Sequence, residues 1–555
     1  MNAERLLEHY EKIADASDAI ARLRRFILDL AVRGKLVPQD PANEPASELL
    51  KLIDAGRRLA GCKAGAEVAA KSPPFDLPSG WVWSTIGSIC SKTGSGSTPR
   101  GGKEVYIDHG IPFLRSQNVY DDGLRLSDVA YIAPEVHLRM AGTAVKASDL
   151  LLNITGGSMG RCCRVPDQFG EGNISQHVAI IRPAIVSMAH YIHKLVLSPY
   201  FQAFIFDEQT GAGRGGLPKN RMDQITVALP PLAEQHRIVA KVDELMALCD
   251  QLEAARIERE AKRDRLAAAS LARLNNLDPE TFRDDARFAL DTLPALTARP
   301  DQIKQLRQTI LNLAVSGKLV PQDPADEPAE ELDVALPRSR SRPFEIPCFW
   351  TWSRLKAVGK LMGGGTPSKS NREFWGGDIP WVSPKDMKVD YLSEAQMTIT
   401  EKAISNSSVN VIDQGSLLFV VRGMILAHSF PVAINQSAVT INQDMKALIP
   451  KNGQMAEYLL RALKGLKPQM LAKVQRSSHG TCRLEGSDYS EFLIPIPPLA
   501  EQHRIVAKVD ELMTLCDQLE SSLTSADDTR RKLLDALLAE ALAPVNVEYL
   551  QEAAQ

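Results

Sequence analysis

The chain lacks the features that define several protein classes. Its eight cysteines are scattered over 555 residues, with no CxxC pair and no histidine at ligand spacing, which argues against a disulfide framework or a Cys/His zinc site. No apolar run is long enough to span a bilayer, and the charged N-terminal segment has no secretory signal pattern. We therefore expect a reduced, cytoplasmic protein without a structural metal and without a membrane partner.

The chain also lacks a charge of one sign. Its 65 Lys and Arg residues nearly balance its 68 Asp and Glu residues, giving a net charge of −3. This balance excludes a protein that is basic over its whole surface, so any nucleic-acid-binding surface must be local or shared with a partner. The length and the hydrophobic content of 44% predict several domains, each with its own core.

The most informative feature is a repeat. Pro230–Leu252 and Pro497–Leu519 differ at a single position, and LAVRGKLVPQDPANEPA (Leu30–Ala46) returns as LAVSGKLVPQDPADEPA (Leu313–Ala329). The longer stretches between these frames resemble each other only in outline. The two frames must therefore be under the same structural or binding constraint, whereas the two stretches between them are under different ones. This pattern predicts two domains of shared architecture that bind different targets.

The repeated frames predict long helices. Each begins after a proline pair, which suits a helix start, and its apolar residues then alternate at steps of four and three, as in a coiled-coil seam. Shorter helices are expected around Leu23–Val32 and Ile303–Val315, each ended by a glycine. We expect the helices from Leu232 and Leu499 to run antiparallel, with the N-terminal helix against the C-terminal one. The seam residues are Ile238, Val242, Leu245, Cys249 and Leu252, and Ile505, Val509, Leu512, Cys516 and Leu519.

Polar residues off the seam are repeated as well. A coil within the chain would tolerate drift at such positions, so we predict a surface that docks the same partner protein at two sites. The simpler alternative is that the helices only bury their seams. The predicted docking residues are Glu234, Gln235, Arg237 and Lys241, and Glu501, Gln502, Arg504 and Lys508.

The two stretches between the frames open alike. Phe75–Leu229 and Phe344–Ile496 each start with W-x-W, continue with a glycine loop and a Thr-Pro pair, and then reach an Ile-Pro pair. Short β-type runs mixed with helical segments predict an α/β or α+β fold for both. The remaining segments are a helical N-terminal segment (1–50), a linker (51–74), a central helical spacer and linker (230–343), and a C-terminal spacer helix (497–555).

Glycine-rich loops in both domains carry side chains suited to DNA. Glycine lets the backbone approach a ligand closely, and Arg, Lys, Gln and Asn reach base edges or phosphates. The alternative is that each loop is only a solvated turn. The candidate contacts are Thr98, Arg100, Arg115, Gln117, Asn118, Arg161, Arg214, Lys219 and Arg221 in the first domain, and Thr366, Lys369, Arg372, Ser383, Lys385, Arg422, His479 and Arg483 in the second.

Over nearly its whole length the chain resembles the specificity (S) subunit of a type I DNA restriction–modification system. The resemblance is carried by the repeated PPLAEQHRIVAKVDEL and GKLVPQDP segments and by the W-x-W, Gly/Thr-Pro and Ile-Pro motifs in this order. It implies that 75–229 and 344–496 are target recognition domains, each reading one half of a split DNA sequence. It also implies that the helices set the spacer between half-sites and bind two adenine-N6 methyltransferase (M) subunits.

The resemblance places the chemistry elsewhere. Two restriction (R) subunits, which act as nuclease and translocase, complete such a complex. S-adenosylmethionine, ATP and Mg belong to the partner subunits, and this chain is expected to hold no cofactor, metal or catalytic residue.

Three other functions have partial support in the residue patterns. SPPF (Ser72–Phe75) is similar to a motif of amino-methyltransferases, but the second copy has SRPF and no glycine-rich cofactor motif precedes it. GGTPSKS (Gly364–Ser370) lacks the glycine before lysine that a phosphate-binding loop uses. A coiled-coil scaffold that binds two different protein ligands stays open on the residue patterns alone. Segments 55–72 and 277–300 lengthen the framework and receive no functional interpretation.

Overall fold

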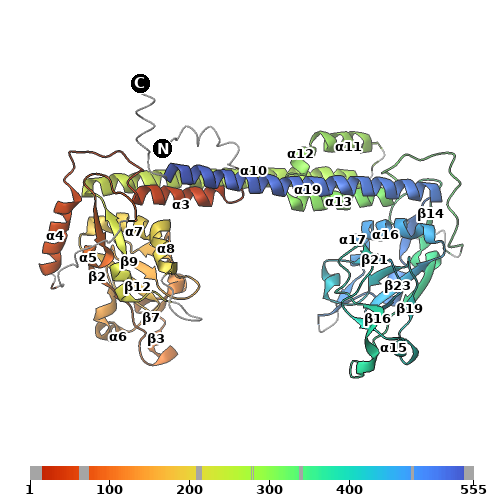
Figure 1. The fold of residues 1–555 in the computed structure, drawn as a ribbon, viewed down its shortest axis with the longest axis horizontal. Coiled ribbons are helices and arrows are strands. Elements are labelled where there is room, and N and C mark those ends of the chain that lie inside the picture. Colours follow the sequence, from red (N-terminus) through yellow and green to blue (C-terminus); the bar gives the residue numbers. More distant parts are fainter. Residues whose placement is uncertain are drawn as a thin grey trace. The chain divides into compact units, whose positions relative to one another are not determined.

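The computed structural model describes residues 15–59, 61, 74–207, 216–276, 278, 280–334, 336, 342–476 and 480–542. The chain forms two compact units, Met1–Ile257 with Asp527–Gln555 (unit 1) and Glu258–Ala526 (unit 2). Each unit holds one mixed α/β domain together with helical segments (Figure 1). None of the helices in the described ranges is long and apolar enough to cross a membrane.

Two long helices carry the repeated sequence. Helix α10 spans Leu232–Asn276 and helix α19 spans Leu499–Leu542, and each begins directly after a proline pair. Proline suits this place because the first turn of a helix needs no backbone N–H there. The boundary between the units falls inside both helices, so each unit contains one segment of α10 and one of α19.

In unit 1, helix α3 (Ala19–Val32) contacts a segment of both long helices. Residue numbers rise in opposite directions along α3 and α10 and in the same direction along α3 and α19. The two long helices are therefore antiparallel within this unit, and the N-terminal helix lies against the C-terminal one, as expected. The hydrogen bonds that show these directions are Arg24–Asp250 and Arg256–Ala16 O with α10, and Ser17–Asp527 and Arg22–Asp535 with α19.

In unit 2, helix α13 (Pro300–Val315) takes the same position. It runs parallel to its segment of α10 and antiparallel to its segment of α19, so the long helices are antiparallel here too. Both units thus repeat one helical arrangement. The hydrogen bonds that show these directions are Arg299–Glu260 and Asn312–Asn275 with α10, and Arg307–Asp517 and Arg504–Asp326 with α19.

Three further helices occupy segments that the sequence left without a role. Residues 51–59 of the predicted linker belong to α4 (Ala46–Leu59), whose Leu49 and Ile53 are buried in the core of unit 1. The linker prediction is wrong there because this amphipathic stretch packs on the domain. In unit 2, α11 (Phe282–Asp291) and α12 (Leu293–Leu296) cover the end of α10 through an apolar cluster around Leu271.

Each α/β domain is built on two main sheets with similar strand orders, one of four strands and one of five. The strand orders are β10-β9-β12-β2 and β3-β7-β4-β11-β8 in the first domain, and β15-β23-β20-β21-β17 and β18-β16-β22-β19 in the second. One parallel pair is equivalent in the two domains, β11 with β4 and β22 with β16, and the second domain has a further parallel pair, β21 with β17. The first and last strands of each domain pair as β1–β13 and β14–β26. The predicted fold class is thereby confirmed.

These are the bounds of the strands. In the first domain they are β1 Val82–Thr85, β2 Cys90–Ser95, β3 Tyr106–Ile107, β4 Ile111–Leu114, β7 Ala130–Ile132, β8 Ala144–Val145, β9 Leu150–Asn153, β10 Cys162–Arg164, β11 Gly172–Ile174, β12 Val178–Pro183 and β13 Thr226–Leu229. In the second they are β14 Thr351–Arg354, β15 Gly359–Gly363, β16 Trp375–Val382, β17 Tyr391–Leu392, β18 Thr398–Ile399, β19 Val411–Ile412, β20 Leu417–Val420, β21 Val432–Asn435, β22 Val439–Ile441, β23 Met445–Pro450 and β26 Leu493–Ile496.

In each unit the sheet with β12 or β23 lies nearer the helices than the sheet with β7 or β16 (Figure 1). Each domain has a divided helical segment before its exit loop. In the first domain it consists of α7 (Ala189–Leu197) and α8 (Pro199–Asp207), and in the second it contains α16 (Ala456–Gly465) and α17 (Lys467–Leu471). A proline near each break explains the interruption, because it cannot donate the hydrogen bond that would continue the helix.

Six of the ten seam residues are buried and Leu245, Leu512 and Leu519 are half-buried, but they do not pack against the other long helix. Ile238 and Val242 are buried in the cluster that contains the first domain's core and α3, and Ile505 and Val509 are buried in the corresponding cluster of the second. Leu252 is 39% exposed, so its place in the seam is wrong. The first turns of each long helix are part of the core of an α/β domain, because α3 or α13 and the domain pack against them.

Candidate nucleic-acid interface

Each domain is fixed to its long helix by a buried joint of repeated residues. In unit 1 the Trp81 indole donates to Glu234 (Nε1 to Oε2, 3.0 Å), and in unit 2 the Trp350 indole donates to Glu501 (2.9 Å). Gln322 also donates to Glu501, at 2.7 Å. Burial raises the pKa of both carboxyl groups, against the smaller effect of these hydrogen bonds. The joint therefore unites the helix start with the W-x-W motif.

The repeated GKLVPQDP segment completes each joint. Gly34 (φ +66°) and Gly317 (φ +72°) hold the left-handed conformation that favours glycine. A Cβ at Gly34 would lie 2.3 Å from Cγ of Pro78, and one at Gly317 would lie 2.4 Å from Cγ of Pro347. Three repeated motifs thus meet at one place in each unit, and this contact is one demand that kept the frames identical.

A second contact aligns each domain on its helix. Lys194 of α7 pairs with Asp243 of α10 at 2.7 Å, and Arg461 of α16 pairs with Asp510 of α19 at the same distance. Arg461 is nearly buried, whereas Lys194 is more exposed. Each domain is therefore held at two points along the helix.

The predicted docking surface needs a correction. Four of its eight residues are buried inside their own unit, with at most 2% exposed, because they belong to the joints. The two glutamines donate to the carbonyl oxygens of Pro230 and Pro497. Arg504 pairs with Asp326 at 2.6 Å, and Lys241 and Lys508 pair within their helices. The docking prediction is wrong for Glu234, Gln235, Glu501 and Gln502.

A cluster of five loops forms where the two sheets of the first domain meet. We call it the loop cluster. It consists of the glycine loop after β2 (94–99), the loop after β4 (115–118), the loop after β9 (154–161), the turn that joins β11 to β12 (175–177) and the described part of the exit loop (216–219). The turn leads from one sheet to the other, so it lies at the centre of the cluster.

Backbone hydrogen bonds join these loops to one another. In the first domain the bonds are Ser97 N to Ile174 O (3.2 Å), Ser175 N to Leu114 O (2.9 Å), Ile154 N to His177 O (3.0 Å) and Leu217 N to Ile154 O (2.9 Å). In the second they are Gly365 N to Ile441 O (2.9 Å), Asn442 N to Val382 O (2.9 Å), Val421 N to Asp444 O (2.9 Å) and Leu484 N to Val421 O (2.8 Å). The second loop cluster (363–367, 383–386, 421–429, 442–444 and 480–485) thus has the same backbone frame.

The structure brings most of the predicted contacts into these clusters. Thr98, Gln117, Arg161 and Lys219 are exposed in the first cluster, and Lys385, Arg422 and Arg483 are exposed in the second. Arg115, Thr366 and Ser383 are half-buried there. Arg100, Arg221, Lys369 and Arg372 are exposed beside the clusters, and Arg214 and His479 lie outside the described residues.

One predicted contact is wrong. Asn118 is 1% exposed, accepts a hydrogen bond from Arg115 N and donates to Arg125 O, so it shapes its loop from inside. Asp386 does the same in the second domain, where its carboxylate accepts from Ser383 N at 2.8 Å. This turn requires a short polar side chain that bonds its own backbone, which explains an Asn or Asp without any DNA contact.

The exposed cations have specific neighbours. Arg161 and Arg125 both lie over the Tyr120 ring, 4.8 and 5.0 Å from its centroid. In the second domain Arg422 and Arg483 face each other across a β-bridge. Each domain therefore has two arginines close together at or beside its loop cluster, an arrangement suited to phosphate or guanine.

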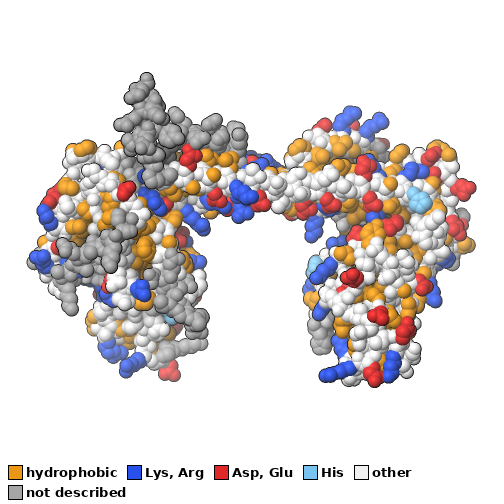
Figure 2. Space-filling model, in the orientation of Figure 1, with side chains coloured by type: hydrophobic (Ala, Val, Ile, Leu, Met, Phe, Trp, Pro, Cys, Tyr) orange, Lys and Arg blue, Asp and Glu red, His pale blue; other side chains and the backbone are white. Residues whose placement is uncertain are grey.

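Charge outside the clusters is mixed. On the face drawn in Figure 2, Lys and Arg side chains are interspersed with Asp and Glu over both domains. Within the described ranges no group of three or more His, Cys, Asp or Glu side chains is placed to hold a metal ion. The positive charge suited to a polyanion is thus local, as the near-neutral composition requires.

The central turn was missed by residue patterns. Gln176, His177 and Gln443 are exposed in it, yet none was predicted as a contact. The signal was present, since NISQHVAIIRP and VTINQDMKALIP place one Gln identically before the β12 and β23 strands. A short polar turn between two strands looks like an ordinary hairpin until the sheets on either side are known.

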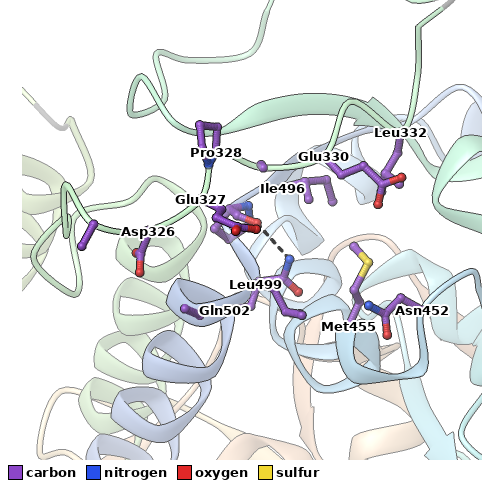
Figure 3. A pocket seen from close by; sticks show the side chains of 14 residues that line it. Asp326, Glu327, Pro328, Glu330, Leu332, Asn452, Met455, Ile496, Leu499 and Gln502 are labelled. Carbon is purple, nitrogen blue, oxygen red and sulfur yellow. Dashed lines mark hydrogen bonds between the residues drawn. The ribbon is translucent and has the colours of Figure 1, made fainter.

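A pocket of about 420 Å³ lies at the joint of unit 2 (Figure 3). Residues 325–332 line one side and the start of α19 lines the other, with Asn452 and Met455 at its base. Asp326, Glu327 and Glu330 make its rim acidic. None of its lining residues belongs to the loop cluster, so the pocket is part of the attachment of the domain and not of the reading surface.

Comparison with known proteins identifies the family. Residues 78–263 and 348–525, more than half of the chain, match the family model described as "Type I restriction modification DNA specificity domain". The chain belongs to this family. The predicted resemblance is confirmed, and so is the function at this level, sequence-specific DNA binding in a type I restriction–modification system.

Other type I specificity subunits are similar over most of their length. Those of the EcoAI and EcoEI enzymes of Escherichia coli are each 27% identical to this chain, over 93% and 94% of both chains respectively. The crystal structure of the HsdS subunit from Thermoanaerobacter tengcongensis is 20% identical, covers 84% of this chain and 98% of that chain, and has a TM-score of 0.42.

Proposed function

We propose that this specificity chain reads a bipartite DNA site, one half with each loop cluster, and that it carries no catalytic group itself. The observation that supports this most directly is the pair of loop clusters, which share one backbone frame and differ in their side chains. A shared frame lets both domains dock on a duplex in the same way through its backbone, and different side chains read different base edges.

The differences fall at equivalent positions of the clusters. Arg115 corresponds to Ser383, and Thr155 corresponds to Arg422, because these residues occupy the same places in the backbone hydrogen bonding and bridges of the two domains. Arginine suits guanine, whereas a hydroxyl is less selective. The two half-sites are therefore different sequences.

The long helices supply the partner surface. After the joint residues are set aside, identical side chains remain exposed or half-exposed on both long helices, and an identical exposed surface suits two copies of one protein. We assign this surface to two methyltransferase subunits, with two restriction subunits added for cleavage; S-adenosylmethionine, ATP and Mg then belong to those partners. The residues are His236, Lys241 and Glu244 on α10, and His503, Lys508 and Glu511 on α19.

A methylome comparison tests the reading function. Single-molecule sequencing of a host with the gene intact and deleted should show the loss of one split, asymmetric motif that carries N6-methyladenine on both strands. The variant Arg115→Ala should then relax one half of that motif, at a cost of about 1–3 kcal/mol for a lost bidentate contact. Unchanged methylation in cells that express this chain and its methyltransferase would favour a scaffold for two protein ligands.

A charge reversal tests the partner surface. Replacing Glu244 and Glu511 by Lys should release the methyltransferase subunits in co-purification, because both carboxylates face solvent on the repeated surface. The circular-dichroism melt should stay close to wild type, since neither residue is buried. Assembly at wild-type affinity would remove these residues from the contact.

A further inference from the structure

One exposed polar residue is the same in both loop clusters although its neighbours differ. The turns 175–177 and 442–444 each have a central glutamine, Gln176 in the first domain and Gln443 in the second, and both side chains are exposed. The turns are equivalent, because Val178 N donates to Ser175 O (3.0 Å) and Met445 N donates to Asn442 O (3.2 Å). The next residues, His177 and Asp444, already differ.

The glycine loop packs directly against this turn in both domains. A Cβ at Gly96 would lie 2.0 Å from Ile174 O, and a Cβ at Gly364 would lie 2.0 Å from Asn442 O. Only glycine permits this approach, and in both loops the Thr-Pro pair begins two residues after it. In the second domain the Thr366 hydroxyl donates to the Gln443 amide oxygen.

The surrounding positions vary between the domains. Arg115, Thr155 and His177 around Gln176 correspond to Ser383, Arg422 and Asp444 around Gln443. The clusters therefore have one constant amide within a ring of variable side chains. Variable side chains fit the bases that distinguish the half-sites, so a constant amide fits a base that both half-sites share.

We propose that Gln176 and Gln443 each contact an adenine at the equivalent position of their own half-sites. A glutamine amide binds adenine through two hydrogen bonds, in which its oxygen accepts from the N6 amino group and its nitrogen donates to N7. The Thr366 hydroxyl occupies one lone pair of the Gln443 oxygen and leaves the other lone pair and both amide hydrogens for the base. This assignment rests on the proposed reading function and adds a base that both halves contain.

The test compares motifs from methylomes of cells with wild-type protein, Gln176→Ala or Gln443→Ala. Each variant should lose the requirement for adenine at one position of one half-site and keep every other position. Gln176→Glu, which keeps the shape but can only accept hydrogen bonds, should shift that position toward cytosine. Unchanged motifs in all three variants would overturn the assignment.

Binding to modified duplexes gives a second readout. With 7-deazaadenine at the assigned position, which lacks the N7 acceptor, wild-type affinity should fall roughly ten-fold or more, and that of Gln176→Ala should not change further. An equal loss in Gln176→Ala for all four bases would indicate a phosphate contact and overturn the assignment. A wild-type chain that yields no bipartite motif would instead overturn the proposed function, so the two failures are distinguishable.

Discussion

Replacing Gly364 by Ala should abolish reading by the second domain and leave the first intact. The new methyl group would lie 2.0 Å from Asn442 O and 2.3 Å from Ile441 O. Both atoms are backbone, so the glycine loop and the central turn must separate by at least about 1 Å to relieve the overlap. That separation moves Thr366 and Gln443 out of their common position.

The energetic cost should be modest in comparison with the stability of a domain. Overpacking of this kind costs about 1–3 kcal/mol, and loss of the Gly365 N to Ile441 O hydrogen bond adds about 1 kcal/mol. A domain with about 5–15 kcal/mol of stability stays folded. A matched control is Gly415→Ala, at φ +81° with nothing within 4 Å, since the first domain has Ser148 at φ +64° in the equivalent turn. It costs about 1–2 kcal/mol and leaves the loops in place.

The assay is anisotropy of the methyltransferase complex on three duplexes: the cognate site and versions with either half-site scrambled. For Gly364→Ala, scrambling the second half-site should add no penalty, whereas scrambling the first should still cost several kcal/mol at about 1–3 kcal/mol per base pair. Gly415→Ala should keep both penalties. A full wild-type penalty at the second half-site in Gly364→Ala would refute the role of this contact.

Three further predictions concern the contacts that attach each domain to its long helix. Burial raises the pKa of Glu501, so its carboxyl group favours folding at low pH and this contribution is lost as the pH rises. In denaturant unfolding at pH 8, Glu501→Gln should therefore be at least as stable as wild type. Glu501→Leu should lose about 1–3 kcal/mol of unfolding free energy, because it leaves the Trp350 indole unpaired. The Arg504 guanidinium lowers the pKa of the Asp326 carboxyl group, so Asp326→Asn should be less stable than wild type at neutral pH. This difference in unfolding free energy should shrink as the pH falls below about 4. A difference that does not depend on pH would contradict the ion pair. Arg461→Ala should lower the melting temperature more than Lys194→Ala, because the Arg461 side chain is more buried and its loss also removes a hydrogen bond to the Tyr391 hydroxyl; equal shifts would count against this.

The repeat predicted the architecture because periodicity and identical frames survive in one chain. The repeat led to a wrong prediction for four frame residues, which were expected on a docking surface and are buried in the joints. A buried carboxylate such as Glu234 looks like a surface residue when only its helix is known. Its partner, Trp81, lies more than 150 residues earlier, and only the folded domain brings the two together. Long-range contacts of this kind leave no local signal.

The loops were predicted in part for a related reason. Arg161 and Arg422 could be chosen by residue type, and the structure places both in the clusters. Asn118 could not be separated from them, because its side chain turns inward to bond the backbone. Gln176 was missed because its importance depends on the junction of two sheets, which no single segment reveals.

The sameness of the two joints also bears on how such genes change. A recognition domain that begins with W-x-W and ends at a PPLAEQ helix start meets the same tryptophan pocket, carboxylate and glycine on either long helix. Recombination between the two copies can therefore cross over within identical sequence and still yield a folded chain. New pairs of half-sites then arise in one step, without the gradual redesign of a binding surface.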